Sequence, residues 1–381
     1  MTKNGSVRIL VNAVHSKSGG GLTYLRNVLA LLGQEMDVHA VIQADQKDAV
    51  APICTQAGVT LHVLPTWSKL GTVLAQEQIS VPLLGRKIKA EVIFSPANYG
   101  PIFGPPTVIL LRNAFEVAAL EERLSKRVYW LAVKMLTWAC FKTCNRAIVV
   151  SAHAARTFLA VFGLGEDVRL SVIHHGVGPA FHPPAQGEER IAERLLAVSD
   201  LYVQKNFETL LRAVALLAPD YPALRLDIAG RELDPAYAAS LRTLCAELGI
   251  RDRVTFLGGL PPDDIAELYR RAKVFAFPSL VETFGNPLVE AMASGIPIVC
   301  SDSAAMPEIT GGAALLAHPN NPVHMAGHIR NLLNDEILWQ DVSAKGLERA
   351  QDFSWKRTAE LTAQILREAA KPKILREAAK H

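Results

Sequence analysis

The chain has 381 residues, of which 50% are hydrophobic and 20% are charged, and its formal net charge is +3. This length accommodates two or three domains, and the weak net charge does not favour a nucleic-acid-binding protein, which would present a strongly basic face. Five scattered cysteines indicate a reducing cytoplasm rather than a disulfide framework. No apolar stretch reaches the length of a signal-peptide core or of a membrane-spanning helix, so we expect a cytoplasmic protein.

Short apolar runs alternate with helical or irregular segments through the first half of the chain. This alternation predicts a doubly wound parallel sheet, in which ligands bind beyond the carboxyl ends of the strands. The runs lie at 7–11, 38–42, 59–64, 92–94, 108–111, 147–150 and 171–174.

Three glycines follow the first of these predicted strands. Gly19, Gly20 and Gly21 precede a helical pattern that starts at Leu22. A strand, a glycine loop and a helix can form a phosphate-binding turn, because glycines let the backbone approach an anion closely. The spacing matches neither the dinucleotide fingerprint nor the P-loop, so a plain connector is an equal alternative.

The strand at 108–111 delivers Arg112 and Asn113 to the carboxyl edge of the predicted sheet. A guanidinium at this edge can bind a phosphate. It can also be an ordinary charged residue at a strand end, and the sequence leaves both interpretations open.

Between residues 112 and 146, seven basic side chains stand against three acidic ones. A helix of this composition can lie on an anionic membrane surface, with aromatic side chains at the level of the lipid headgroups. The apolar residues are spread evenly around the helix, which favours a core helix whose aromatic side chains pack inward. The aromatic residues in question are Tyr129, Trp130, Trp138 and Phe141.

Glycine and proline cluster at 176–179, and the hydrophobic period restarts after them. We therefore predict a first domain over 1–175, a second over 176–355, and a terminal helix with a frayed tail over 356–381. His174 and His175 are expected to be hinge or cleft residues rather than metal ligands, since no third ligand is apparent.

The second half of the chain repeats the alternation of strands and helices. Lys205 lies near a predicted strand-to-helix junction, where an ammonium group can neutralise the charge that builds on a departing diphosphate. A lone lysine can also be a solvated surface charge, and both readings stand at this point. The predicted strands are 195–198, 224–229, 253–257, 274–277 and 296–300.

The loop and helix after the strand at 274–277 form the predicted anion site. Asn286 is expected to cap a helix over 288–294, with Pro287 at the first helical position, where its missing N–H group costs nothing. Unpaired N–H groups and the helix dipole at such a start favour a phosphate, and a diphosphate is the expected guest.

Two carboxylates flank this predicted anion site: Glu282 in the loop and Glu290 one turn into the helix. Carboxylates repel phosphate, so they are better explained as acceptors for the neutral hydroxyls of a sugar and a ribose. In the alternative interpretation, Glu290 is a first-turn glutamate favoured by the dipole and Glu282 is a solvated loop charge.

The two glutamates, with Phe284-Gly285 between them and Ala291-Met292-Ala293-x-Gly295-x-Pro297 after them, resemble the signature of glycosyltransferase family 4. The resemblance covers nearly the whole chain and is strongest from Ser199 to Glu308. It implies the α/β GT-B fold of a retaining enzyme, with two Rossmann-like, doubly wound parallel-sheet domains that face a cleft. In that fold the first domain is on the acceptor side, the second binds the nucleotide sugar, and the terminal helix crosses back to the first domain.

The resemblance also implies a role for each candidate residue. Lys205 and the N–H groups around the helix start would take up leaving-group charge, Glu290 would hold the ribose, and Glu282 would hold the transferred sugar. The glycines after the first strand would face the donor phosphates, and the backbone of Leu257 and Gly258 would contact the base. Lys205, Glu282 and Arg112 form the implied catalytic group, and the implied binding set is Gly20, Gly21, Lys205, Leu257, Gly258, Glu282, Phe284, Gly285, Asn286, Pro287, Leu288 and Glu290.

Two positions depart from the family pattern. Arg112 stands where family members often carry a histidine, and Asp200 stands where they carry an arginine five residues before the lysine. The chain has no Asp-x-Asp triplet. We therefore expect an enzyme that needs no metal or other cofactor, in which the helix dipole and Lys205 replace the cation.

The expected activity is retaining transfer of a hexose from a nucleotide-diphosphate sugar, with GDP-mannose slightly preferred over a UDP-sugar. The segments Ser95-Pro96-Ala97-Asn98 and Arg112-Asn113 resemble family members that build bacterial surface polysaccharides. This similarity favours a saccharide or lipid-linked saccharide acceptor in polysaccharide biosynthesis, with peripheral contact to an anionic membrane at its inner face.

Two alternative functions remain. A sugar-nucleotide epimerase or hydrolase of the same fold should carry catalytic acids in both domains, and no such pair is apparent. A non-catalytic nucleotide-binding scaffold would have no need for both Glu282 and Glu290.

Overall fold

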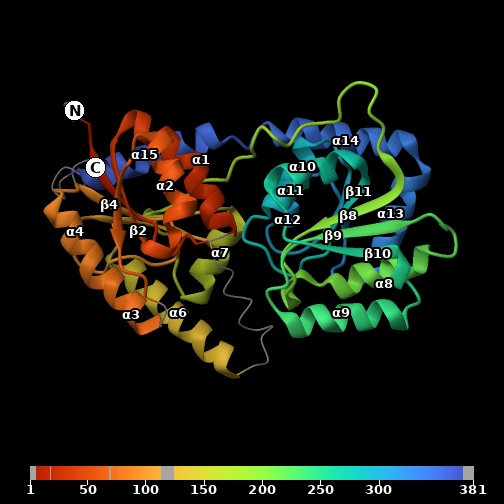
Figure 1. Ribbon diagram of the computed structural model, residues 1–381, viewed down its shortest axis with the longest axis horizontal. Helices are drawn as coiled ribbons and strands as arrows, with labels where there is room; N and C mark the ends of the chain where they lie inside the picture. The colour runs from red at the N-terminus through yellow and green to blue at the C-terminus, as the bar shows by residue number, and fades with distance from the viewer. Residues whose placement is uncertain (1–5, 18, 68–69, 113–123, 372–381) are drawn as a thin grey trace. The chain divides into compact units, whose positions relative to one another are not determined.

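The computed structural model describes residues 6–17, 19–67, 70–112 and 124–371 (Figure 1). The chain divides into two compact units, the first made of residues 1–176 and 355–381 and the second of Val177–Ser354. Three features discussed above lie outside the described residues: Asn113, the acidic residues that precede Leu124, and the end of the chain after Lys371.

The first unit is built on a seven-stranded parallel sheet in the order β3-β2-β1-β4-β5-β6-β7. The order reverses between β1 and β4, which makes this the switch point of the sheet. Strands β4 and β5 are buried along their whole length, which explains why they read as continuous apolar runs. The strands are β1 (Arg8–Asn12), β2 (Asp37–Gln43), β3 (Thr60–Leu64), β4 (Val92–Ser95), β5 (Thr107–Leu111), β6 (Arg146–Val149) and β7 (Leu170–Val172).

Helices connect these strands, and a π-helical turn, η2 (Gln76–Ser80), joins the two helices α3 and α4. The first helix begins at Gly19, so the glycines expected in a loop form its first turn instead. Glycine is tolerated there because the first N–H groups of a helix have no intrahelical partner in any case. Besides η2, the helical elements between these strands are α1 (Gly19–Glu35), which is this first helix, η1 (Ala44–Gln46), α2 (Lys47–Ala57), α3 (Leu70–Ala75), α4 (Val81–Lys87), α6 (Leu124–Thr143) and α7 (Ala152–Val161).

The last helix, α15 (Trp355–Ala370), belongs to the first unit. The Trp355 ring lies 6.0 Å from that of Tyr24 in α1 and 5.5 Å from that of His175. The hydroxyl of Thr358 donates a hydrogen bond of 2.7 Å to the carbonyl of His174. The two histidines are therefore part of the packing between α15 and the end of β7.

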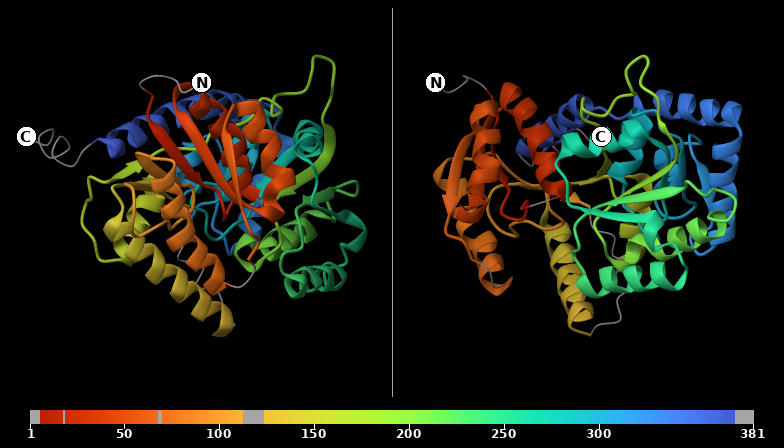
Figure 2. Two further views of the ribbon diagram at one scale, coloured as in Figure 1. Left: turned by 60° about the vertical axis from the view of Figure 1, so that its left-hand side comes forward. Right: turned by 45° about the vertical axis from the view of Figure 1, so that its right-hand side comes forward.

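Helix α6 has two different halves. Thr137, Cys140 and Phe141 are completely buried, as expected for a core helix. Tyr129, Leu131 and Met135 are 46%, 57% and 65% exposed, so the predicted inward packing is wrong for the N-terminal part of α6, up to Met135. Figure 2 shows this N-terminal part extending beyond the rest of the first unit. Within the described residues, no helix has the length and apolarity required to span a membrane.

The second unit is built on a six-stranded parallel sheet in the order β10-β9-β8-β11-β12-β13, which reverses between β8 and β11. Strand β8 starts at Ile191, four residues before the start of the strand predicted at 195–198. The strands are β8 (Ile191–Val198), β9 (Arg225–Ala229), β10 (Val254–Gly258), β11 (Ala272–Phe277), β12 (Ile298–Ser301) and β13 (Leu315–Ala317).

Helices lie on both sides of the second sheet: Figure 1 shows α8 and α9 on one side and α10 and α11 on the other. Apolar side chains of α8, such as Leu210 and Val214, join those of β9 in one buried cluster. The helical elements are η3 (Val203–Lys205), α8 (Phe207–Leu217), α9 (Pro235–Glu247), η4 (Arg251–Arg253), α10 (Pro262–Arg271), α11 (Asn286–Ala293), α12 (Met306–Thr310), α13 (Pro322–Asn334) and α14 (Glu336–Ala350).

Candidate functional site

The switch point of the second sheet carries a buried ion pair. Strand β8 leads into η3, which holds Lys205, and β11 leads into the loop that holds Glu282. The Nζ atom of Lys205 and the Oε1 atom of Glu282 are 2.5 Å apart, and their side chains are 9% and 13% exposed. The structure therefore brings together two residues that the sequence marked separately, and neither is a solvated surface charge.

Local contacts fix the two loops to each other. The backbone N–H of Leu280 donates to the carbonyl of Gln204 over 2.8 Å. Asn206, which follows Lys205 directly, has a left-handed backbone with φ of 51°, and its Nδ2 atom donates to the carbonyl of Pro278 over 3.1 Å. Asparagine tolerates this conformation better than most residues, so the chain can turn into α8 directly after the lysine.

The lysine of this pair remains a cation despite its burial. Burial acts to lower the pKa of Lys205, but the carboxylate of Glu282 and the hydroxyl of Tyr202 raise it above its ordinary value. The ammonium also lies 5.3 Å from the centre of the Tyr202 ring and 5.7 Å from that of Phe277. A fixed cation in a site of low polarity can strongly stabilise developing negative charge.

Helix α11 begins one residue earlier than predicted, at Asn286, and Gly285 is its N-cap. The predicted capping role of Asn286 is therefore wrong, and Pro287 is the second helical residue. Gly285 has φ of 90°, a conformation that favours glycine, and a Cβ atom there would lie 3.0 Å from the side chain of Leu288. The side chains of Phe284 and Leu288 are buried, which leaves their backbone groups as their contribution to a ligand.

Glu290 lies one turn into α11 and is mostly buried. The Tyr269 hydroxyl lies 3.2 Å from both the Oε2 atom of Glu290 and the carbonyl of Pro287. Burial raises the pKa of Glu290 to about 7, although the hydrogen bond from Tyr269 acts in the opposite direction. A glutamate placed only to favour the helix dipole would be expected in solvent, so the burial favours a binding role.

Arg231 is a candidate that the sequence reasoning missed. It follows β9 and Gly230, and its Nη2 atom lies 2.6 Å from Oδ2 of Asp200, with side-chain exposures of 43% and 25%. A Cβ atom on Gly259 would lie 2.5 Å from the Arg231 side chain, which places the arginine over the end of β10. The sequence signal was its position two residues after a predicted strand, close to the signal that marked Arg112.

Leu257 and Gly258 lie at the end of β10, at the same carboxyl edge and two strands away from β8. Gly258 has φ of 71°, and its carbonyl accepts a 2.8 Å hydrogen bond from the N–H of Gly230. This bond joins the ends of β9 and β10, so the predicted base contacts lie beside Arg231.

The first unit brings Arg112 together with the N-terminal glycines. A Cβ atom on Gly21 would lie 2.7 Å from Nη1 of Arg112, so a larger residue there would displace the guanidinium. The N–H of Arg112 donates to Oδ1 of Asn98 over 2.7 Å, and burial lowers the pKa of the arginine below its ordinary value. Gly20 is exposed in the same helical turn. Arg112 and the N-terminal glycines, which the sequence marked separately, thus lie together at one edge of the sheet of the first unit.

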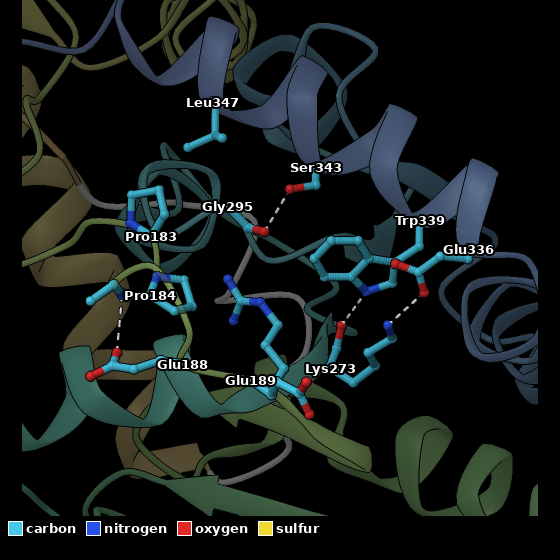
Figure 3. Close-up of a pocket in the computed structure, with 12 residues that line it drawn as sticks. Pro183, Pro184, Glu188, Glu189, Lys273, Gly295, Glu336, Trp339, Ser343 and Leu347 are labelled. Carbon is cyan, nitrogen blue, oxygen red and sulfur yellow. Dashed lines mark hydrogen bonds and ion pairs between the residues drawn. The ribbon is translucent and has the colours of Figure 1, made fainter.

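A cavity of about 490 Å³ lies at the opposite edge of the second sheet, near the starts of β8 and β11. Figure 3 shows the indole N–H of Trp339 donating a hydrogen bond to the backbone carbonyl of Lys273. The ammonium of Lys273 forms an ion pair of 2.9 Å with Glu336. The guanidinium of Arg190 is also at this cavity, and its donors are used by backbone carbonyls. These four carbonyls belong to Tyr269, Arg270, Ala272 and Ser294.

Arg190 therefore acts as a structural residue that joins the ends of α10 and α11 to the start of β8. Burial lowers its pKa to about 10, and the four carbonyls compensate for the lost hydration. Within the described parts of the chain, no group of three or more His, Cys, Asp or Glu side chains could hold a metal ion.

Residues 183–349 match the family model described as Glycosyl transferases group 1. The O-antigen chain mannosyltransferase B of Escherichia coli is 34% identical over 166 residues, which cover 42% of this chain and 42% of that protein. The MMP alpha-(1->4)-mannosyltransferase of Mycolicibacterium hassiacum is 33% identical over 227 residues, which cover 58% of this chain and 54% of that protein. The matched region thus spans about half, or less, of each of these relatives.

Solved structures confirm the predicted fold over nearly the whole chain. Sucrose-phosphate synthase from Thermosynechococcus elongatus superposes with a TM-score of 0.77 at 19% identity, covering 95% of this chain and 98% of that chain. WaaG, a glycosyltransferase involved in lipopolysaccharide biosynthesis, superposes with a TM-score of 0.74 at 17% identity, covering 94% and 99%. Both units thus have the parallel-sheet architecture of GT-B proteins.

Proposed function

We propose that the protein transfers a hexose from a nucleotide-diphosphate sugar to a saccharide hydroxyl. The proposal is supported by the match of residues 183–349 to the model of Glycosyl transferases group 1. The observation that carries the proposal is the buried pair of Lys205 and Glu282 at the switch point of the second sheet. Open α/β sheets bind ligands at this position.

In the proposed reaction, the bond between the anomeric carbon and the β-phosphate oxygen breaks, and a bond from the acceptor oxygen forms on the same face of the sugar. The departing phosphate accepts the proton of the acceptor hydroxyl, and the configuration is retained because the new bond forms on the face from which the phosphate leaves. Lys205 and the N–H groups at the start of α11 stabilise the charge on the departing diphosphate. These groups replace a metal ion in the proposal.

Donor binding would rearrange the ion pair. The phosphate oxygens of the donor compete with Glu282 for the ammonium of Lys205. The released carboxylate of Glu282 then accepts hydrogen bonds from the hydroxyls of the hexose, and Glu290 accepts them from the ribose. We propose GDP-mannose as the donor ahead of a UDP-sugar, since both relatives described above are named mannosyltransferases.

We also propose that the first unit contacts an anionic membrane that carries a lipid-linked acceptor, at the inner face of that membrane. The support is the exposed half of α6, where Val128, Leu131 and Met135 are apolar and lie on one helical stripe, with Arg127 and Lys134 close in sequence. Apolar side chains that enter the headgroup region and nearby basic ones are the features of an interfacial helix.

Nucleotide binding tests the transferase proposal. Thermal unfolding with GDP, UDP, ADP and their sugars should show one nucleotide that stabilises the protein, by about 2.7 kcal/mol at 100 times its dissociation constant. Glu290→Ala should lose most of this shift. Glu336→Ala, which removes a carboxylate at the opposite edge of the same sheet, should keep it. A folded wild-type protein that no nucleotide stabilises would refute the proposal.

Co-flotation with vesicles tests the membrane contact. Vesicles that contain anionic lipid should carry the wild-type protein to the top of a gradient, and Leu131→Glu with Met135→Glu should reduce this recovery severalfold. Ile337→Glu is the matched control, because Ile337 is also an exposed apolar residue but lies in the second unit. Equal recovery of both variants would contradict a contact through α6.

A further inference from the structure

Buried polar atoms without a hydrogen-bond partner gather at the carboxyl edge of the first sheet. Five such atoms belong to residues at the ends of β1 and β2 and to η2. Buried polar atoms are nearly always bonded, so a concentration of exceptions calls for a functional explanation. The five atoms are Asn12 Oδ1, His15 Nε2, Ser16 Oγ, Gln43 Oε1 and Glu77 Oε2.

A carboxylate with no contact to solvent lies at the centre of this group. Glu77 in η2 has no exposed side-chain surface, and its Oε1 atom accepts a 2.8 Å hydrogen bond from Nδ2 of Asn12. Its Oε2 atom and Nε2 of His15, two of the five atoms named above, lie 3.2 Å apart, which is ion-pair distance although the geometry is not that of a hydrogen bond. A buried carboxylate requires donors, so Glu77 favours the form of His15 that carries a proton on Nε2.

This arrangement leaves the other ring nitrogen of His15 as an acceptor. When Nε2 carries the proton of the neutral ring, Nδ1 has a free lone pair. Nδ1 is not among the buried unpartnered atoms, and 17% of the His15 side chain remains exposed. The ring also contacts Tyr99 edge-on, with 4.9 Å between centroids. His15 thus presents a fixed hydrogen-bond acceptor next to the β1/β4 switch point.

We propose that Nδ1 of His15 accepts a hydrogen bond from a hydroxyl of the saccharide acceptor, and that Glu77 is the positioning residue that holds the ring in the accepting tautomer. This inference rests on the proposed transferase function. A neutral hydroxyl fits the site better than a phosphate, because the lone pair of Nδ1 and the charge of Glu77 both repel anions. His15 binds the acceptor and does not need to take its proton.

Two matched substitutions separate the two nitrogens of His15. The amide of asparagine can occupy the position of Nδ1, whereas the amide of glutamine can occupy that of Nε2. His15→Asn should therefore keep acceptor binding and lose the contact with Glu77. His15→Gln should keep the contact with Glu77 and raise the KM for the acceptor about tenfold, the loss of one hydrogen bond.

The kinetic experiment uses GDP-mannose as the donor and α-linked mannobiose as the acceptor probe, with the KM of each measured separately. Both variants should leave the donor KM unchanged, and their melting temperatures report folding. If His15→Gln transfers sugar with the acceptor KM of the wild type, the inference is wrong while the transferase function stands. If the wild type binds no nucleotide, the proposed function itself fails.

Nitrogen NMR of the histidine rings gives a readout that does not depend on turnover. In the neutral form of its ring, His15 of the wild type should carry the proton on Nε2. Glu77→Gln should shift His15 to a mixture of tautomers, while His328, which contacts a backbone carbonyl in the second unit, serves as the internal reference. A proton on Nδ1 in the wild type would overturn the inference whatever the acceptor is.

Discussion

The two sheets carry different pairs of side chains at their switch points. In the second unit an ammonium meets a carboxylate, and both Lys205 and Glu282 keep some contact with solvent. In the first unit the carboxylate of Glu77 is fully enclosed, and only its partner His15 reaches the surface. The pair of Lys205 and Glu282 in the second unit provides a permanent positive charge, which suits a departing diphosphate. The pair of His15 and Glu77 in the first unit provides a neutral acceptor atom, which suits a hydroxyl.

Removing the cation Lys205 should have the largest effect on catalysis, and it would test whether the ion pair of the second unit provides charge. Lys205→Met should lower kcat by about 10²- to 10³-fold, the range seen when one group that stabilises transition-state charge is removed. Steady-state kinetics measures this loss. Lys273→Met removes a lysine that pairs with Glu336 at the opposite edge of the same sheet, and it should leave kcat within about twofold. A similar loss in both variants would indicate general damage to the second unit.

The second prediction uses pH to separate Glu290 from the rest of its site. Burial raises the pKa of Glu290 to about 7, so the carboxylate ionises between pH 6 and 8. Ribose hydroxyls bind the ionised form better, and GDP affinity should therefore rise with pH in this window. The affinity of Glu290→Gln should change less, since only the titration of GDP itself remains. Calorimetric titration at several pH values measures both, and parallel curves would contradict the assignment.

The same group has the opposite effect on the stability of the free protein. The pKa of Glu290 in the folded state lies above its ordinary value. The contribution of this group to the free energy of unfolding is therefore greatest at low pH and falls as the pH rises from about 4.5 to 7. Glu290→Gln should consequently be more stable than the wild type at pH 8, and the difference should vanish near pH 4.5. Denaturant unfolding at both pH values checks this sign.

The fourth prediction has the smallest expected effect, because Arg231 is nearly half exposed. If Arg231 contributes to donor binding, Arg231→Met should raise the donor KM about three- to tenfold with little change in kcat. Asp200→Asn should have a similar but weaker effect, since it removes only the carboxylate that orients the guanidinium. Arg242→Met, which breaks an exposed pair with Glu232 in the same unit, is the control. An unchanged donor KM in Arg231→Met would limit the cationic site to Lys205.

The difference between the switch points also explains what could be predicted from the sequence. Lys205 and Glu282 follow β8 and β11 within a few residues, so strand periodicity alone places them at the same edge. Glu77 comes from a π-helical turn between β3 and β4, and no strand ends near it. Nothing in the local pattern connects it to His15.

The start of α11 and the burial of α6 are two further features that the sequence did not predict correctly. Asn286 is a good capping residue by type, but the chain needs a left-handed residue at the turn before α11, and Gly285 takes that place. In the N-terminal part of α6, Leu131 and Met135 are exposed although the even distribution of apolar residues favoured a buried helix. Burial depends on which elements pack against a helix, and its own sequence does not contain that information.

The membership of α15 in the first unit has a consequence for biosynthesis. Its contacts with Tyr24 and His174 close the first unit, yet the ribosome makes Trp355 only after the whole second unit. The usual order, in which the N-terminal domain folds first during translation, is therefore not available. We expect nascent chains that stop at residue 354 to protect the second unit from protease while the first remains sensitive. Stalled chains that also include α15 should protect both.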